Sequence, residues 1–495
     1  MFDGIFTNNA IAAAGRQEKE FFEHEIETWK NSKTRRAQID ADRYYRGEHD
    51  ILGRVRTGIG QGGRLVAIDN LPNNRIVDNQ YAKAVDQKTN YLFAKPFAFK
   101  TKSEKYAAAL KRAFDKKFQR TLQNLAESSI NGGVGWLHAY YGAGPELRFK
   151  AFRPWEVLPF WQDEAHTELD CVARVYDAAA YAGGALETVE KVELYKLGGV
   201  EYYYLDGGKL IEDGRSDYLY LDGKPYNWER LPVVPFKYNN AEISLLSKTK
   251  TIQDAINETL SDFQNSMQED NRNTILIIKN YDGEDLTEFR HNLAAYGVIK
   301  VRSVEAGIEG GVDSLRVDVN GENFERIYKM LKKTFIENAM AYDAKDERLA
   351  GSPNQMNILS MYSDMDLDAN GMESEYKASF EDLKFFLDTH FSLSGAGEFF
   401  GEELEISFDR DMLMNESDII NSARNSTGII SNKTIVANHP WVNDADEEMG
   451  QIEREKDENP DVYEDAFQKM NETIQAQRMP PMETPDVALH KRETA

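Results

Sequence analysis

The sequence predicts an α+β protein in which one block of antiparallel strands lies between helical segments. From Trp136 to Phe236 the chain consists of short runs rich in Tyr, Val and Leu, separated by Gly and Asp, a pattern typical of strands joined by tight turns. On either side of this block, apolar residues recur at intervals of three and four, as along one face of a helix. The 495 residues suffice for about two to four compact units.

The composition is that of a globular protein with an acidic balance of charge. Hydrophobic residues make up 41% and charged residues 29% of the chain. No window approaches the roughly 18 to 20 consecutive apolar residues that span a bilayer, so we expect no membrane contact. The 59 basic and 84 acidic residues give a net charge of −25, which argues against tight wrapping of nucleic acid but allows DNA to slide past.

Three helical regions are predicted before the strands. Residues 16–46 predict a helix or helix pair, because four large apolar side chains can form one stripe there. They are Phe21, Phe22, Ile26 and Trp29. After a glycine-rich, irregular stretch over 47–74, a second helix is expected over 79–91 and a third over about 103–131.

Two long amphipathic helices are predicted after the strands. The first lies within 247–270, and its apolar stripe is formed by Ile252, Ile256, Leu260, Phe263 and Met267. The second lies within 320–343, with Phe324, Ile327, Tyr328, Leu331 and Phe335 in register. Each helix needs a neighbour that covers its stripe.

Residues 271–319, between these helices, predict a compact insert of mixed structure. The expected elements are a strand at 274–279, a helix at 285–296 and strands at 298–301 and 314–319.

The remaining chain predicts a loop, a long helix and a polar end. Residues 344–354 contain Gly and Pro and indicate a loop. A helix is expected over 355–391, with a kink at Ala369–Gly371, where its pattern weakens. Beyond Val442 large apolar residues are few, and we expect 461–495 to be disordered.

Two short motifs resemble ligand sites but lack the context that their chemistry requires. Gly58–Gly63 satisfies G-x-G-x-x-G, yet Leu71–Asn74 falls where the helix that faces a pyrophosphate should begin. Asp366–Gly371 matches the first half of an EF-hand loop, but Lys377 stands where the bidentate Glu should be. A flexible loop is a better interpretation of the first motif than a dinucleotide site, and a polar kink in a helix is a better interpretation of the second than a calcium site.

A third motif, His166-x-Glu168-x-Asp170, places three possible metal ligands on one face of a strand-like segment. No further pair of ligands has recognisable spacing, so a solvated strand face is a better interpretation than a metal site.

Cys171, the one cysteine, is expected to be a small buried side chain. The chain has no phosphate-loop, H-E-x-x-H or G-x-S-x-G signature. The sequence therefore predicts no catalytic residue, no metal and no cofactor.

Several phrases together resemble the SPP1-type family of phage portal proteins. They are Tyr44–His49, Asn74–Asn79 leading to Tyr91–Pro96, Arg153–Pro159, Leu231–Phe236 and Ser426–Thr434. Their order, and the succession of helix, insert, helix, loop and kinked helix, agree over roughly residues 30–450. Two local departures are Ala94, where the family tends to have Gly, and Tyr238, which separates Phe236-Lys237 from Asn239-Asn240.

The resemblance implies a portal fold in a ring of about twelve subunits at one capsid vertex. The implied parts are N-terminal helices and a β-rich wing (1–246), a first stem helix (247–270), a clip (271–319), a second stem helix (320–343), a tunnel loop (344–354), a kinked wing helix with a returning strand (355–415), a helical crown (416–460) and a tail (461–495). The expected stem-packing residues are Ile252, Ile256, Leu260, Phe263, Met267, Phe324, Ile327 and Leu331. Lys345 and Arg348 are expected to face DNA in the channel.

The implied function is that of a head–tail connector through which double-stranded DNA is packaged and ejected. The implied partners are the terminase large subunit, scaffolding and major capsid proteins, and head-completion or tail adaptor proteins. The implied location is the virion, after assembly in the bacterial cytoplasm. Two alternatives stay open: a nucleic-acid enzyme or ATPase component of the packaging machinery, which would need a catalytic signature, and an unrelated cytoplasmic scaffold, which would leave the ordered phrases as coincidence.

Overall fold

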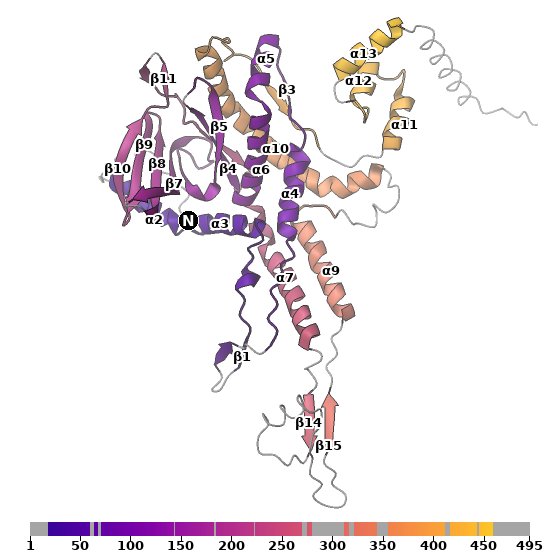
Figure 1. Cartoon of the computed structure of the whole chain (residues 1–495). Helices are drawn as coiled ribbons and strands as arrows, with labels where there is room; N and C mark the ends of the chain where they lie inside the picture. The colour runs from indigo at the N-terminus through magenta and orange to yellow at the C-terminus, as the bar shows by residue number, and fades with distance from the viewer. Residues whose placement is uncertain are drawn as a thin grey trace, which may run out of the picture. The chain divides into compact units, whose positions relative to one another are not determined.

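Figure 1 shows the computed structural model, which describes residues 18–59, 64–67, 71–142, 144–182, 185–221, 223–269, 275–279, 311–315, 321–343, 355–410, 416–442 and 445–458. The chain divides into two compact units. The first comprises Met1–Ala344 and Met361–Met412, and the second comprises Lys345–Ser360 and Leu413–Ala495. In the described ranges no helix has the length and apolar character that a membrane span requires.

The predicted N-terminal helix pair is present as α2 (Glu18–Lys30) and α3 (Lys33–Tyr45). The apolar stripe of α2 packs on a strand, where the Phe22 ring lies edge-on to Phe160 with 5.4 Å between centroids. Ser32 ends the turn between the helices, because its side chain caps α3.

The second predicted helix is α4 (Gln80–Phe93), but the prediction of one helix over 103–131 is wrong. The chain forms α5 (Glu104–Ala113) and α6 (Lys116–Gly132) instead. Asp115 separates them, because its carboxylate accepts the backbone N–H groups of the next turn at 2.9 and 2.8 Å and so starts a new helix.

The strand block is antiparallel, as predicted, and forms one two-stranded sheet and two larger sheets. One has the order β13-β4-β5, from β4 (Val134–Tyr141), β5 (Leu147–Phe152) and β13 (Val233–Lys237). The other has the order β10-β9-β8-β7-β6, from β6 (Val157–Trp161), β7 (Leu169–Ala182), β8 (Ala185–Lys196), β9 (Gly199–Asp206) and β10 (Lys209–Ser216). Buried residues of both sheets, including Trp136 and Trp161, share one core.

Short elements connect these parts. They are η1 (Asp50–Gly53), β1 (Thr57–Ile59), β2 (Leu65–Ala67), β3 (Ala98–Lys100), η3 (Pro154–Glu156), β11 (Leu219–Leu221), β12 (Lys224–Tyr226) and β16 (Glu405–Ser407). Strand β16 pairs with β3, so the chain that follows the longest helix lies beside the N-terminal part of the first unit.

The two amphipathic helices are α7 (Leu245–Glu269) and α9 (Gly321–Asn338). Between them, β14 (Ile275–Lys279) pairs with β15 (Gly311–Leu315) in an antiparallel register. The strand predicted at 274–279 is thus observed as β14. Of the strand predicted at 314–319, residues 314 and 315 lie in β15, which begins earlier, at Gly311, and residues 316–319 lie outside the described residues. The helix and strand predicted at 285–296 and 298–301 lie outside the described residues.

The longest helix, α10 (Gln355–Leu393), continues without a break through Ala369–Gly371, and the kink there stays a prediction. Its buried aromatic side chains pack with those of the first unit; the Phe380 ring lies 5.3 Å from Phe97. The loop predicted at 344–354 lies outside the described residues.

The second unit contains α11 (Glu416–Ser426), α12 (Asn432–Ala437) and α13 (Ala445–Glu458). Ser431 caps α12, and the Lys433 ammonium lies 2.5 Å from the Asp446 carboxylate. Neither α11 nor α12 contains a buried residue. The tail at 461–495 lies outside the described residues.

Candidate functional site: the anchoring of the two long helices

The face of α7 that is most deeply buried is polar. Four side chains spaced by four residues, which we call the polar ladder, are at most 2% exposed: Gln253, Asn257, Ser261 and Asn265. Of the predicted apolar stripe, only Ile256 is fully buried, while Met267 is 49% exposed. Within this chain, the polar ladder therefore anchors α7 from Gln253 to Asn265, whereas the buried Leu245 and Leu246 hold its start.

The polar ladder binds the backbone of the irregular segment that precedes α4. The oxygen atoms of the four side chains each accept one backbone N–H group: Asn265 from Asn74 (2.7 Å), Ser261 from Ile76 (2.9 Å), Asn257 from Asp78 (2.9 Å) and Gln253 from Tyr81 (2.9 Å). The first three donors belong to the irregular segment before α4, which has no strand partner, and Tyr81 lies in the first turn of α4, whose N–H groups have no partner within the helix. The side chains of α7 thus satisfy groups that would be costly to bury unpaired.

The spacing of the polar ladder follows from the geometry of helix and extended chain. Four residues of a helix rise about 6 Å. Two residues of extended chain span about 6.6 Å. Side chains one turn apart on α7 can therefore reach every second N–H group, as they do at positions 74, 76 and 78.

His49 extends the polar ladder to α3. Its Nδ1 accepts a hydrogen bond from the Asn257 amide at 2.8 Å, and its Nε2 donates to the Tyr44 carbonyl at 3.0 Å. This arrangement requires the neutral imidazole. Burial lowers the pKa of His49, which favours the same neutral form.

Asp78 connects the same segment to α9. Its carboxylate accepts hydrogen bonds from the Tyr328 hydroxyl and from Lys332, whose Nζ lies 3.0 Å away. Burial acts to raise the pKa of Asp78, but these hydrogen bonds outweigh it and lower the pKa. The rings of Phe263 and Phe324 also stack, with 3.8 Å between centroids, and join α7 directly to α9.

A buried ion pair fixes the residues that follow α9. The Lys88 ammonium, 3% exposed, lies 2.7 Å from the Asp368 carboxylate and donates to the Met340 carbonyl at 3.1 Å. The Tyr238 hydroxyl donates to the same carboxylate at 2.7 Å. Burial lowers the pKa of Lys88, although the carboxylate opposes this. The contacts of Lys88 thus join α4 to α10 and to the residues that follow α9.

The predicted stem-packing residues are mostly half-buried in the single chain. Ile252, Leu260, Phe263, Phe324 and Leu331 are half-buried, whereas Ile327 is 47% exposed. Their packing against other subunits stays a prediction. The predicted DNA-facing residues, Lys345 and Arg348, lie outside the described residues.

The two motifs that resemble a nucleotide site and a calcium site lie in a strand pair and in a helix, and neither forms the site. Gly58 lies in β1, whose pairing with β2 replaces the helix that a dinucleotide site needs. Asp366 and Asp368 lie on α10 and accept hydrogen bonds from tyrosine hydroxyls. They do not belong to a calcium-binding loop.

The expectation that His166 lies on a strand face is wrong. His166 lies in a turn with φ of 55°, its ring stacks on Trp161, and its Nδ1 lies 2.9 Å from the Glu242 carboxylate. The described residues contain no cluster of three or more His, Cys, Asp or Glu side chains that could hold a metal. Cys171 is buried, as expected, and burial raises the pKa of its thiol.

The comparisons with known proteins identify the class. The family described as phage portal protein, SPP1 Gp6-like, matches residues 25–461. The protein is therefore a phage portal protein, a connector between head and tail. The chain belongs to the SPP1 Gp6-like family of portal proteins.

Individual relatives agree with this assignment. The portal protein of Bacillus phage SPP1 is 28% identical over 422 residues, which cover 83% of this chain and 82% of the relative. The portal protein of Clostridium phage phiCD119 is 27% identical over 432 residues, covering 83% and 90%. A solved structure, the neck of a native GTA particle with C12 symmetry, matches with a TM-score of 0.38 and 13% identity over 72% of this chain and 88% of that chain, too weak a likeness to support an argument.

Proposed function

We propose that the chain assembles into a ring of about twelve subunits at one vertex of the capsid, and that double-stranded DNA enters and leaves the head through the ring. The match of the portal family over residues 25–461 carries this proposal. The net charge of −25 supports it, because an acidic wall repels phosphates and lets DNA slide.

Within the ring, α7 and α9 form the stem, residues 271–319 the clip, 344–354 the tunnel loop and 416–460 the crown. The stacking of Phe263 on Phe324 supports a stem made of paired helices. The clip and stem dock the terminase large subunit and later the head-completion or tail proteins, while the wing contacts scaffolding and major capsid proteins. The ring has no catalytic role, and ATP hydrolysis belongs to the terminase.

Negative-stain electron microscopy of the purified protein, combined with light scattering, tests the assembly. We expect rings with a central hole and a mass of about twelve chains, because exposed apolar side chains on the long helices, such as Met267 and Ile327, need a neighbour. A monodisperse monomer at high concentration would contradict the proposed assembly.

A further inference from the structure

One segment of this acidic chain is strongly basic. Residues 95–120 contain nine Lys or Arg side chains and only two acidic ones, and all nine cations are exposed. We call them the basic surface: Lys95, Lys100, Lys102, Lys105, Lys111, Arg112, Lys116, Lys117 and Arg120. The chain as a whole has 84 acidic and 59 basic residues, so this local excess opposes the general composition.

Most of these cations have no anionic partner. Lys102 lies 2.7 Å from Glu403, in an exposed pair that contributes little, and Lys95 donates to the Arg410 carbonyl. In the described ranges, the structure gives none of the other seven an ion pair. One of the two acidic residues, Asp115, is occupied as the cap of α6. Within the described residues, seven of the nine cations thus have no ion-pair partner.

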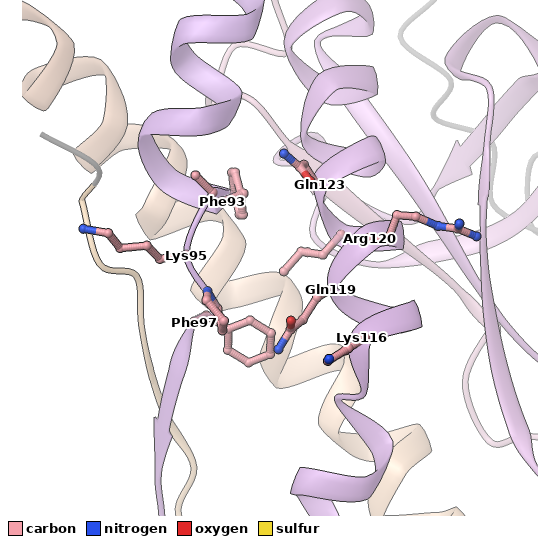
Figure 2. Close-up of a pocket in the computed structure, with 10 residues that line it drawn as sticks. Phe93, Lys95, Phe97, Lys116, Gln119, Arg120 and Gln123 are labelled. Atoms are coloured by element: carbon pink, nitrogen blue, oxygen red, sulfur yellow. The ribbon is translucent and has the colours of Figure 1, made fainter. Parts of the chain in front are cut away.

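A rigid element holds the centre of the basic surface. A pocket of ≈ 230 Å³ lies here. Figure 2 shows Lys95 on one side of it and Lys116, Gln119, Arg120 and Gln123 of α6 on the other. Lys116 and Arg120 are one helical turn apart. The opposite face of α6, which includes Phe118, Leu122 and Leu125, is buried, so this helix presents its cations in a fixed arrangement.

The chemistry of the basic surface fits a phosphate backbone better than an acidic protein. Protein interfaces are anchored by aromatic and other apolar side chains at their centre. No large hydrophobic side chain is among the exposed residues between positions 95 and 120. Contacts to a nucleic-acid backbone need no such anchor, because Lys and Arg replace the counterions of the phosphates.

We propose that the basic surface binds the phosphate backbone of double-stranded DNA without reading its sequence, through residues other than Lys345 and Arg348. The choice of DNA as the partner rests on the proposed function, which brings the ring into contact with the genome. The phage portal then has an acidic body that does not retain DNA and one local surface that does.

A charge-matched pair of variants tests this proposal on assembled rings. The first carries Lys116→Gln, Lys117→Gln and Arg120→Gln; the control carries Arg36→Gln, Lys83→Gln and Lys224→Gln, three exposed cations outside the basic surface. Binding of labelled random-sequence duplex DNA is measured by fluorescence anisotropy at several salt concentrations. We expect the first variant to lose about tenfold in affinity at low salt, with a salt slope shallower by about one per lost phosphate contact. The control should bind as the unmodified rings do.

Three outcomes would overturn the proposal. Unchanged binding by the first variant would exclude these cations, and an equal loss in both variants would show an effect of net charge alone. If polyglutamate of matched charge bound the basic surface more tightly than DNA, the surface would be a docking site for an acidic protein. Electron microscopy of both variants shows separately whether rings form. A failure of ring assembly is therefore distinguishable from a failure of DNA binding by the basic surface.

Discussion

Asn257 makes three hydrogen bonds from one fully buried side chain. Its oxygen accepts from the Asp78 backbone at 2.9 Å and from Gln253 at 3.2 Å, and its amide donates to His49 at 2.8 Å. A buried polar group left without a partner costs about 1–3 kcal/mol. At the scale of single residues, this side chain is the point at which the polar ladder joins both the segment before α4 and His49.

Replacing Asn257 by Leu should therefore lower the free energy of unfolding by about 2–4 kcal/mol, because the Asp78 N–H and the His49 Nδ1 both lose their partners. Thermal unfolding followed by tryptophan fluorescence would measure the effect. Glu258→Leu places the same side chain on the exposed face of α7 and should change the melting temperature little. Equal melting temperatures for the two variants would mean that the polar ladder does not stabilise α7.

Lys345 and Arg348 permit a functional prediction at the same scale. Replacing both by Ala should scarcely affect folding, since exposed ion pairs contribute less than about 1 kcal/mol. If they line the DNA path as proposed, heads that contain the variant should package or retain less DNA although rings still form. A double variant of Arg36 and Lys83 serves as a control. Normal packaging yield and retention would remove both residues from the path.

Strands β14 and β15 pair with each other and with no other described strand. They lie between the end of α7 and the start of α9, so the segment that contains them is an insertion into a helix pair that is held elsewhere, by the polar ladder and by Asp78. At the scale of elements, the helix pair should fold without the insertion.

Replacing residues 271–319 by a short Gly/Ser linker should give soluble rings that no longer bind the terminase large subunit or the tail-side adaptor. Pull-down experiments with each partner would measure the loss, and electron microscopy would confirm the rings. Unchanged binding of both partners would show that they dock on other parts of the ring.

The sequence predicted those elements whose signal is local. The helix pair at the N-terminus, the antiparallel strands and both long helices follow from apolar spacing, and each was predicted correctly. The break at Asp115 was missed because the apolar pattern continues across it, although an Asp before a helix is a capping signal.

The polar ladder was missed for a different reason. Its spacing of four residues is visible in the sequence, but polar side chains on a helix are usually solvated, and their partners lie about 180 residues earlier in the chain. The turn at His166 likewise depends on a distant residue, Glu242. Such long-range polar contacts have no periodic signal in one sequence.

The whole molecule combines a net negative charge with three histidines that are buried or half-buried and for which burial favours the neutral form. Burial lowers the pKa of His49, His138 and His390, and for His138 the nearby Lys150 and Arg174 act in the same direction. The folded protein therefore binds fewer protons at these sites than the unfolded chain does. Their contribution to stability is complete above about pH 6.5 and is lost as the pH falls below it.

We therefore expect the melting temperature to fall between pH 7 and pH 5. His138→Phe keeps an aromatic ring between Tyr140 and Phe152 but cannot be protonated, so this variant should lose less stability over the same range. Burial raises the pKa of Glu25, Glu127 and Asp382, which oppose the trend equally in both proteins. An identical fall in the variant would show that His138 does not contribute.

The match between one helical turn and two residues of extended chain has a mechanical consequence. A shift of α7 along the segment by less than about 6 Å would place every accepting oxygen between two N–H groups and break all four bonds together. A shift of one full turn would restore at most three of the four bonds, because Pro72 offers no N–H group before Asn74 and the backbone beyond Tyr81 is already helical. The contact should therefore hold α7 at one axial position and resist small axial forces.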